Sequence, residues 1–297
     1  MPAEPPYTTG TTRIAIVIPS HNRHEVIGGC LDALDQLQGA PFRTIVVDDG
    51  SDPPLAPLLA NAGTHVTVIR QNNGGPAAAR NTGAQVAEDA ELLCFIDDDC
   101  RPRPDWVLRL AAAQGGQRMR LVGGRIENAL PRNIFSSASQ SLSSYLYEYY
   151  QATSSQMTFF TTNNMCCRRS DFLRVGGFDP SFRFASEDRD FSLRWADAGG
   201  VLYYAADAVV DHAHHLTWRA YLRQHASYGR GAHDLHQRML ERGDPRPKIE
   251  PFGFYFGMLT FPLRRRLHAA FAQGLLIGLS QVAMVAGYAQ ARRKSQR

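Results

Sequence analysis

The chain has 297 residues, of which 44% are hydrophobic and 20% are charged. This length and composition are typical of one large or two modest folded domains and exclude a disordered, collagen-like or coiled-coil protein. Five cysteines without a CxxC pair are too few for a disulfide scaffold and do not match a zinc ribbon. The first ten residues contain no basic run leading into an apolar segment. We therefore expect no secretory signal, a disordered tail over residues 1–12 and a cytoplasmic protein.

The net charge of +4 is unevenly distributed along the sequence. From Pro251 onward there are seven basic residues and no acidic ones, which leaves 25 basic against 28 acidic residues in the rest of the chain. A nucleic-acid-binding protein would carry its basic excess on the folded body, whereas here the excess lies beside apolar sequence. We therefore expect no nucleic-acid partner and a peripheral position at the cytoplasmic face of a membrane. The seven residues are Arg264, Arg265, Arg266, Arg292, Arg293, Lys294 and Arg297.

Residues 13–126 alternate short apolar runs with segments of helical pattern. This alternation predicts an α/β protein with a doubly wound, parallel sheet and helices on both of its faces. The expected strands are residues 14–19, 44–48, 65–70 and 92–96, and the expected helices between them include residues 25–37 and 77–88.

Polar clusters follow three of these strands, at residues 20–23, 48–51 and 97–99. Ligands bind beyond the carboxyl ends of the strands in such sheets, so we expect the clusters to share one binding edge. The last cluster is Asp97, Asp98 and Asp99, whose adjacent carboxylates repel one another unless a cation lies among them. Such oxygen ligands suit Mg²⁺ or Mn²⁺ and a phosphate-bearing ligand, while an acidic turn without a ligand is the alternative.

The remaining segments are less regular. We expect residues 133–160, rich in Ser and Tyr, to be irregular or helical, and residues 217–242 to form a helix. Residues 269–291 carry no charge and would form a helix of about 34 Å, long enough to cross a bilayer core. The polar side chains of Gln273, Ser280 and Gln281, with arginines at both ends, favour helices that lie on an anionic membrane surface. A membrane span and a helix buried in a dimer are the alternatives.

The segments IAIVIPSHNR, TIVVDDGSD, NNGGPAAARNTG and FIDDDC occur in this order, and a later block runs from TNNMCC through the pair Glu187-Asp188. Together they resemble the family 2 glycosyltransferases, which have the GT-A fold. The resemblance implies a GT-A-type mixed, mostly parallel sheet over residues 13–215, with a nucleotide-sugar half (13–126) and an acceptor half (127–215). A helical segment (216–250) and C-terminal membrane-associating helices (251–297) would follow as a helical extension.

The resemblance also implies roles for individual residues. Asp99, in the DXD motif of the family, and His212 would hold the metal. Asp188 would be the catalytic base, and Glu187 would orient it or bind the acceptor; an exposed acidic start of a helix is the alternative for this pair. The nucleotide of the donor would be bound by Pro19, Ser20, His21, Arg23, Asp49, Arg80, Asn81, Asp97 and Asp98.

These implications lead to one expected reaction. A divalent cation, Mg²⁺ or Mn²⁺, would stabilise the departing diphosphate of a nucleotide sugar while Asp188 removes the proton of the attacking hydroxyl. We expect an inverting glycosyltransferase that uses a UDP-sugar and acts on a saccharide or lipid-linked acceptor, such as a polysaccharide precursor. His21 stands where the family often has an aromatic residue, which leaves the base of the nucleotide open.

Two other functions fit parts of the sequence. A sugar-phosphate nucleotidyltransferase shares a similar sheet, but it would need a glycine-rich loop with Lys or Arg after the first strand, and PSHNRH does not supply one. A non-catalytic, membrane-associated nucleotide-sugar-binding scaffold would usually have lost an acidic residue that this chain retains.

Overall fold

The computed structural model describes residues 13–39, 41–63, 65–153, 157–244 and 250–296, so the tail expected at residues 1–12 lies outside the described residues. The chain divides into two units. Unit 1 comprises residues 1–127, 156–183 and 187–212, and unit 2 comprises residues 128–155, 184–186 and 213–297. Residues 128–153, 184–186 and 213–215, which the expected division assigns to the catalytic domain, belong to unit 2 together with the C-terminal helices.

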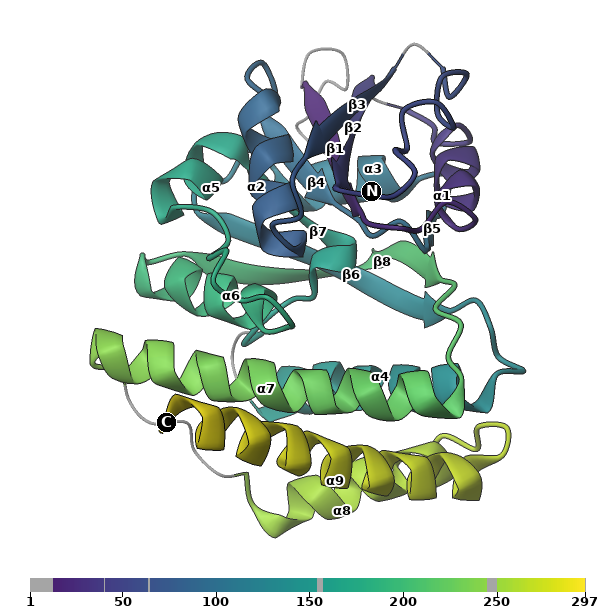
Figure 1. Ribbon diagram of the computed structural model, residues 1–297, viewed down its shortest axis with the longest axis vertical. Helices are drawn as coiled ribbons and strands as arrows, with labels where there is room; N and C mark the ends of the chain where they lie inside the picture. Colours follow the sequence, from purple (N-terminus) through teal and green to yellow (C-terminus); the bar gives the residue numbers. More distant parts are fainter. Residues whose placement is uncertain (1–12, 40, 64, 154–156, 245–249, 297) are drawn as a thin grey trace, which may run out of the picture. The chain divides into compact units, whose positions relative to one another are not determined.

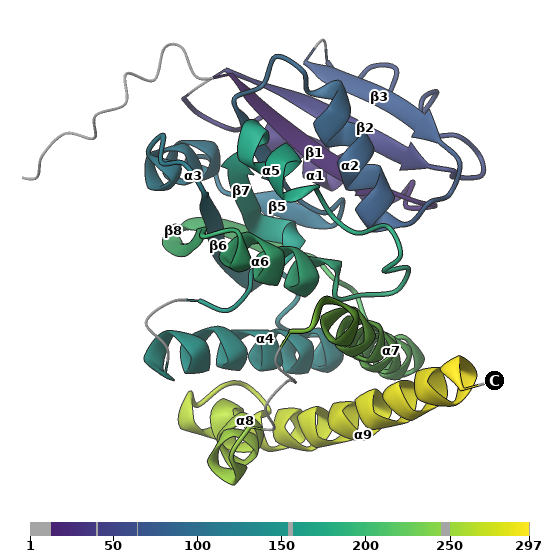
Figure 2. The ribbon, with the colours of Figure 1, turned by 90° about the vertical axis from the view of Figure 1, so that its left-hand side faces the viewer.

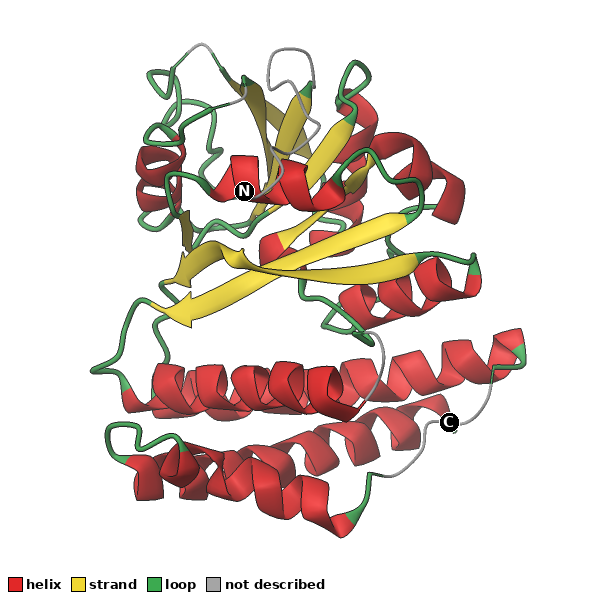
Figure 3. Cartoon of the chain, turned by 180° about the vertical axis from the view of Figure 1, so that it is seen from behind, coloured by secondary structure: helices red, strands yellow, loops and turns green. Residues whose placement is uncertain are grey.

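Unit 1 contains an eight-stranded mixed sheet in the order β3-β2-β1-β4-β7-β6-β8-β5 (Figures 1 and 3). The neighbours β3, β2, β1 and β4 are parallel, whereas β4–β7, β7–β6 and β5–β8 pair antiparallel. The four strands expected from the apolar runs are confirmed. The strands are β1 (Ile14–Ser20), β2 (Phe42–Asp49), β3 (Val66–Gln71), β4 (Leu92–Phe95), β5 (Cys100–Pro102), β6 (Arg120–Asn128), β7 (Met165–Arg168) and β8 (Val201–His212).

The helices of unit 1 include the two expected between the first strands. β1 and β4 are buried almost throughout, as expected for strands covered on both faces, and their side chains form the main core with residues such as Trp106 and Leu110. The helices are α1 (Ile27–Leu34), α2 (Pro76–Val86), α3 (Trp106–Gln114), α5 (Arg169–Val175) and α6 (Glu187–Asp197), with a short 3₁₀ turn, η1 (Thr162–Asn164).

The register of the parallel strands creates the binding edge. Ser20, the last residue of β1, pairs with Asp48 near the end of β2, and Val17 pairs with Phe95 at the end of β4. The polar residues that follow these strands therefore emerge at the same edge of the sheet. This arrangement is the one expected from the sequence.

Unit 2 consists of four helices: α4 (Ile134–Thr153), α7 (Trp218–Arg242), α8 (Phe252–Arg264) and α9 (Ala270–Ser295). Within this unit α4 and α7 form one layer and α8 and α9 a second (Figures 1 and 2). The helix expected at residues 217–242 is confirmed as α7. Of the two possibilities for residues 133–160, the helix holds for most of the segment, because the Asn133 side chain accepts hydrogen bonds from the backbone N–H groups of Phe135 and Ser136 and starts α4.

The crossing of α7 and α9 brings two backbones into direct contact. A Cβ added at Gly229 of α7 would lie 1.9 Å from the carbonyl oxygen of Met284, and one added at Gly287 of α9 would lie 1.9 Å from that of Ala226. Only glycine fits at either position. The α7–α9 crossing is therefore fixed on both helices.

Candidate active site

The three aspartates after β4 are held by residues from the end of β1. The Ser20 hydroxyl donates to Asp98 Oδ2 at 2.6 Å, and Arg23 Nε donates to Asp98 Oδ1 at 3.2 Å. Arg23 also forms an ion pair with Asp99. Burial raises the pKa of Asp98 to about 6, against the lowering effect of Arg23 and Ser20. Arg23 thus supplies part of the positive charge that this acidic cluster requires.

Asp99 lies beside a histidine from a distant strand. The antiparallel pairing of β5 with β8 aligns Cys100 with His212, and the His212 Nε2 atom lies 3.1 Å from Asp99 Oδ1. Burial opposes a charge on His212, but the hydrogen bond and the charge of Asp99 raise its pKa.

These residues form a group that could hold a metal ion. Asp99, Cys100 and His212 each offer a ligand atom within 4.8 Å of the others. Burial raises the pKa of the Cys100 thiol well above its usual range, so this thiol stays protonated and is a poor ligand. The carboxylate and imidazole of the other two fit a divalent cation.

Asp49 at the end of β2 organises a turn before α2. Its Oδ1 atom accepts hydrogen bonds from Gln71 Nε2 at 2.7 Å and from the N–H of Gly74 at 2.8 Å, and its Oδ2 accepts from the N–H of Gly75 at 2.8 Å. The exposed His21 side chain lies against the same strand end, with Nδ1 2.8 Å from the Asp49 carbonyl oxygen. Pro19 is half-buried within β1.

Arg80 joins the two acidic groups of the site. It is 3% exposed, and its guanidinium donates to Asp97 at 2.6 Å and to Glu187 at 3.0 Å. Burial opposes its charge, but the two carboxylates raise its pKa. The neighbouring Asn81 points elsewhere: its amide donates to the carbonyl oxygen of Phe178 at 2.7 Å and accepts from the N–H of the same residue at 2.9 Å.

Asp188 lies in the first turn of α6. The preceding Ser186 has a φ of 79°, a left-handed conformation that sets the direction in which the helix begins. Asp188 is half-buried and accepts a hydrogen bond from the N–H of Arg189 at 2.8 Å. Burial and the adjacent Glu187 raise the pKa of Asp188 to about 7, which suits a group that exchanges protons near neutral pH.

The sequence matches a known protein family. The model of glycosyl transferase family 2 matches residues 15–176, more than half of the chain. The chain belongs to glycosyl transferase family 2. The pre-mycofactocin glycosyltransferase of Mycobacterium tuberculosis is 30% identical over 247 residues, which cover 81% of this chain and 51% of that protein. Glycosyltransferase AglE of Haloferax volcanii is 28% identical, covering 67% of this chain and 66% of that protein. The chain thus spans between half and two thirds of the length of these relatives.

Solved structures share the fold of this family 2 chain. The mannosyltransferase PcManGT from Pyrobaculum calidifontis, in complex with GDP-Man and Mn²⁺, has a TM-score of 0.60 at 18% identity, over 96% of this chain and 77% of that one. GalNAc-T7, with UDP, GalNAc and Mn²⁺, has a TM-score of 0.56 at 15% identity, over 89% and 56%. The expected GT-A-type fold with a C-terminal helical extension is confirmed.

The structure of the family 2 chain brings most of the expected residues together. Arg80 and Asn81 remain candidates for the nucleotide; in the structure Arg80 bridges Asp97 and Glu187, and the Asn81 side chain bonds to the backbone of Phe178. The sequence interpretation also missed Gln71, together with the N–H groups of residues 74 and 75, which bind Asp49. Their signal was the glycine pair before α2, where backbone N–H groups can approach a carboxylate closely.

Proposed function

We propose that the protein is an inverting, metal-assisted glycosyltransferase that transfers a sugar from a UDP-sugar to a hydroxyl of a saccharide or lipid-linked acceptor. The observation that carries this proposal is the Arg80 bridge, which connects the acidic cluster after β4 to the Glu187-Asp188 pair. Transfer of a sugar from a nucleoside diphosphate requires groups that stabilise the negative charge of the diphosphate and a base that is held close to them. Family membership and the glycosyltransferase names of the relatives support this proposal.

In this proposal the donor binds at the ends of β1, β2 and β4. Asp49 would accept the ring N–H of the uracil, and His21 would stack beside the base. Asp99 and His212 would hold the divalent cation, and Asp98 would contact the ribose or the cation. Bound there, the cation would supply Lewis-acid stabilisation of the diphosphate charge. Arg23, which pairs with Asp98 and Asp99, would add positive charge beside the diphosphate.

Asp188 would act as the base. Its carboxylate would take the proton of the acceptor hydroxyl as that oxygen attacks the anomeric carbon from the face opposite the diphosphate, which inverts the configuration. Glu187 is held by Arg80, so its negative charge stays next to Asp188 and keeps the pKa of the base high. Arg80 is in this view a positioning residue.

We also place the enzyme at a membrane surface. Among the described residues one helix, α9, is long and apolar enough to cross a membrane by length and composition, and only 22% of its apolar window is buried. A helix buried in the core of a water-soluble protein would be mostly covered. A lipid-linked or growing polysaccharide acceptor fits a location at the cytoplasmic face.

Calorimetric titration of UDP into the purified protein, with Mn²⁺ and then with EDTA, tests the donor site. We expect binding that EDTA abolishes, and GDP or dTDP binding more weakly. Tighter binding of GDP or dTDP than of UDP would overturn the choice of nucleotide, and UDP binding of equal strength in EDTA would overturn the role of the cation.

A variant separates donor binding from transfer. Asp188→Asn keeps the shape of the side chain but cannot accept the proton, so we expect unchanged UDP binding and at least about a hundredfold slower sugar transfer. Transfer at the wild-type rate would overturn the role of Asp188. Absence of transfer by the wild-type protein with every UDP-sugar and acceptor, despite UDP binding, would favour the non-catalytic scaffold.

A further inference from the structure

α9 is apolar on its outward side as well as at Ile277 on its buried side, and it buries two polar side chains. Phe271, Leu275 and Val282, which follow one another at helical spacing, are 70%, 62% and 64% exposed. Gln273 and Ser280, on the opposite side of the helix, are 3% and 0% exposed. An amphipathic helix in water turns its apolar side inward. The outward side of α9 therefore has the character of a surface that meets an apolar environment.

Hydrogen bonds fix this orientation. The Ser141 hydroxyl of α4 donates to Gln273 Oε1 at 2.6 Å, and Gln273 Nε2 donates to the His268 carbonyl oxygen at 2.7 Å. The Tyr221 hydroxyl of α7 donates to the carbonyl oxygen of Leu276 in α9 at 2.9 Å, while the buried Ser280 hydroxyl is satisfied within α9 by the carbonyl oxygen of Ile277. Because unpaired polar groups are costly in a buried position, rotating α9 to hide its apolar side would break favourable contacts.

α8 extends the exposed apolar surface. Its buried side, with Phe254 and Phe261, packs against Tyr145 of α4. Its other side is exposed, up to 82% at Phe252. α4 and α7 form the other layer of unit 2 (Figure 2), so the exposed sides of α8 and α9 face away from them. We call this surface the α8–α9 outer face; it comprises Phe252, Phe256, Leu259, Leu263, Phe271, Leu275, Leu279, Val282 and Val285.

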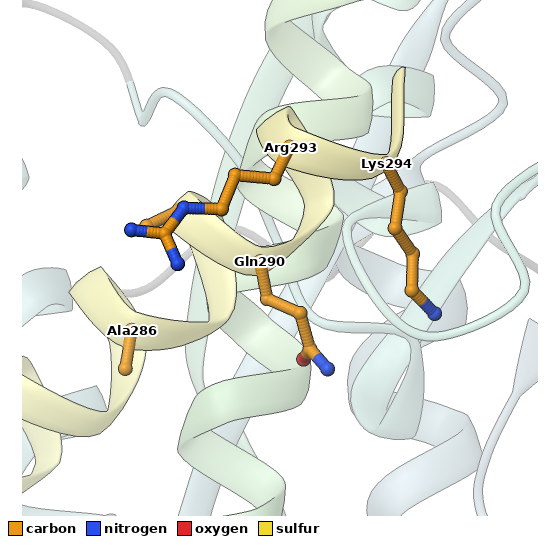
Figure 4. A pocket seen from close by; sticks show the side chains of 5 residues that line it. Ala286, Gln290, Arg293 and Lys294 are labelled. Atoms are coloured by element: carbon orange, nitrogen blue, oxygen red, sulfur yellow. The ribbon is translucent and has the colours of Figure 1, made fainter. Parts of the chain in front are cut away.

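In the described segment from residue 251 to residue 296, which carries the α8–α9 outer face, every charged side chain is a cation. Arg265 pairs with Glu148 of α4 at 2.5 Å. Arg264, Arg266 and the basic end of α9 form no ion pair with any residue that the structure describes. Figure 4 shows Arg293 and Lys294 extending from the last turns of α9, where they line a shallow pocket. An apolar surface with a basic border is complementary to an anionic lipid leaflet.

We propose that the α8–α9 outer face is a membrane-docking surface that lies in the plane of an anionic leaflet and does not span it. The proposal rests on the proposed function only for the location of the enzyme at a membrane. Aliphatic and aromatic side chains would enter the acyl region, while the basic side chains at both ends reach the phosphate groups.

The contact between α7 and α9 argues against a span. Gly229 and Gly287 bring the two backbones together, so α9 cannot cross a bilayer unless it separates from α7 or takes α7 with it. α7 carries charged side chains such as Arg238 and Glu241, which form an ion pair at 2.8 Å. Burying such groups in hydrocarbon is costly, whereas docking in the plane of the leaflet leaves the helix pair intact.

Flotation of the whole protein with vesicles tests the surface without any donor or turnover. We expect binding to vesicles of one part phosphatidylglycerol and two parts phosphatidylcholine, weaker binding to phosphatidylcholine alone, and a decrease with added salt. The double variant Phe271→Glu/Leu275→Glu should lose at least about tenfold in partitioning, because two apolar side chains no longer enter the bilayer. Leu58→Glu in unit 1, at a leucine that is 54% exposed, should bind like the wild type.

Two results would overturn the docking surface. One is vesicle binding by the double variant equal to that of the wild type. The other is absence of vesicle binding by the wild type; a dimer in light scattering that the double variant dissociates would then make a second copy the occupant. The Asp188→Asn variant should bind vesicles like the wild type, so failure of sugar transfer and failure of docking are measured separately.

Labelling tests the in-plane geometry. All five native cysteines are buried, so a cysteine introduced at His268 or at Ser295, before and at the end of α9, would be the reactive one. With protein bound to the outside of sealed vesicles, a membrane-impermeant maleimide should label His268→Cys and Ser295→Cys equally. Protection of one of the two until detergent is added would show a span and overturn the proposal.

Discussion

Asp188 combines burial with a neighbouring negative charge, and both raise its pKa, to about 7 from an ordinary value of 3.8. A base works in its ionised form, so we expect kcat/KM for transfer to rise with pH and to level off above about 7. Initial rates measured from about pH 5 to pH 9 check this. A profile without an inflection near neutral pH would contradict the assignment.

The same pKa has a consequence for stability with the opposite sign. The folded state binds the proton of Asp188 more tightly than the unfolded state does, so this proton adds to the free energy of unfolding. The contribution is complete below pH 3.8 and is lost as the pH rises through about 7. In the proposed mechanism the protein thus gives up some stability in the pH range in which Asp188 would act as base.

Arg80 is nearly inaccessible to water and compensates two carboxylates. Removing one partner of a buried ion pair leaves the others without compensation, so Arg80→Met should lower the free energy of unfolding by about 3–5 kcal/mol. Arg109→Met is the matched control: Arg109 is half-exposed and pairs with Asp105 within one helix turn and with Asp207, so a much smaller loss is expected. Urea denaturation of both variants measures the difference, and equal losses would contradict the role of Arg80.

At the scale of elements, the crossing of α7 and α9 depends on glycine. Gly287→Ala would place a Cβ 1.9 Å from the carbonyl oxygen of Ala226, so the two helices must separate. We expect the free energy of unfolding to fall by about 1–3 kcal/mol. At Gly278, on the same helix, an added Cβ meets only Leu259 Cδ2 at 3.5 Å. Gly278→Ala should therefore raise the free energy of unfolding by up to about 1 kcal/mol, because alanine has a higher helix propensity than glycine. Thermal unfolding followed by circular dichroism distinguishes the two, and similar shifts would argue against the close contact.

The strands between residues 13 and 126 could be predicted because a strand buried on both faces needs a short apolar run. For α4 the sequence left a helix and an irregular segment open, because its Ser and Tyr side chains give a weak helical period and its start depends on one capping residue, Asn133. The clusters at the strand ends were predictable from the topology of parallel sheets. The bridge from Arg80 to Glu187 was not, since it joins residues 107 positions apart through a contact that no local pattern encodes.

At the scale of the whole molecule, the binding edge and the α8–α9 outer face belong to different units. A ligand stabilises the part of a protein that binds it. We therefore expect UDP with Mn²⁺ to slow amide hydrogen exchange in β1, β2 and the residues after β4, and to leave exchange in α8 and α9 unchanged. Vesicles should give the reverse pattern. Mass spectrometry of exchanged peptides measures both, and protection by UDP centred on α8 and α9 would contradict this placement of the donor site.

The position of Arg80 between Asp97 and Glu187 makes the two halves of the site thermodynamically dependent on each other. A cation held at Asp99, as proposed, would also attract the nearby carboxylate of Asp97; this would leave more of the guanidinium charge for Glu187 and Asp188, and that charge would favour ionised Asp188. Linkage is reciprocal, so ionisation of Asp188 changes the affinity of the acidic cluster for its cation by the same factor. Under the proposed roles, loading of the donor and activation of the base would be coupled through one side chain.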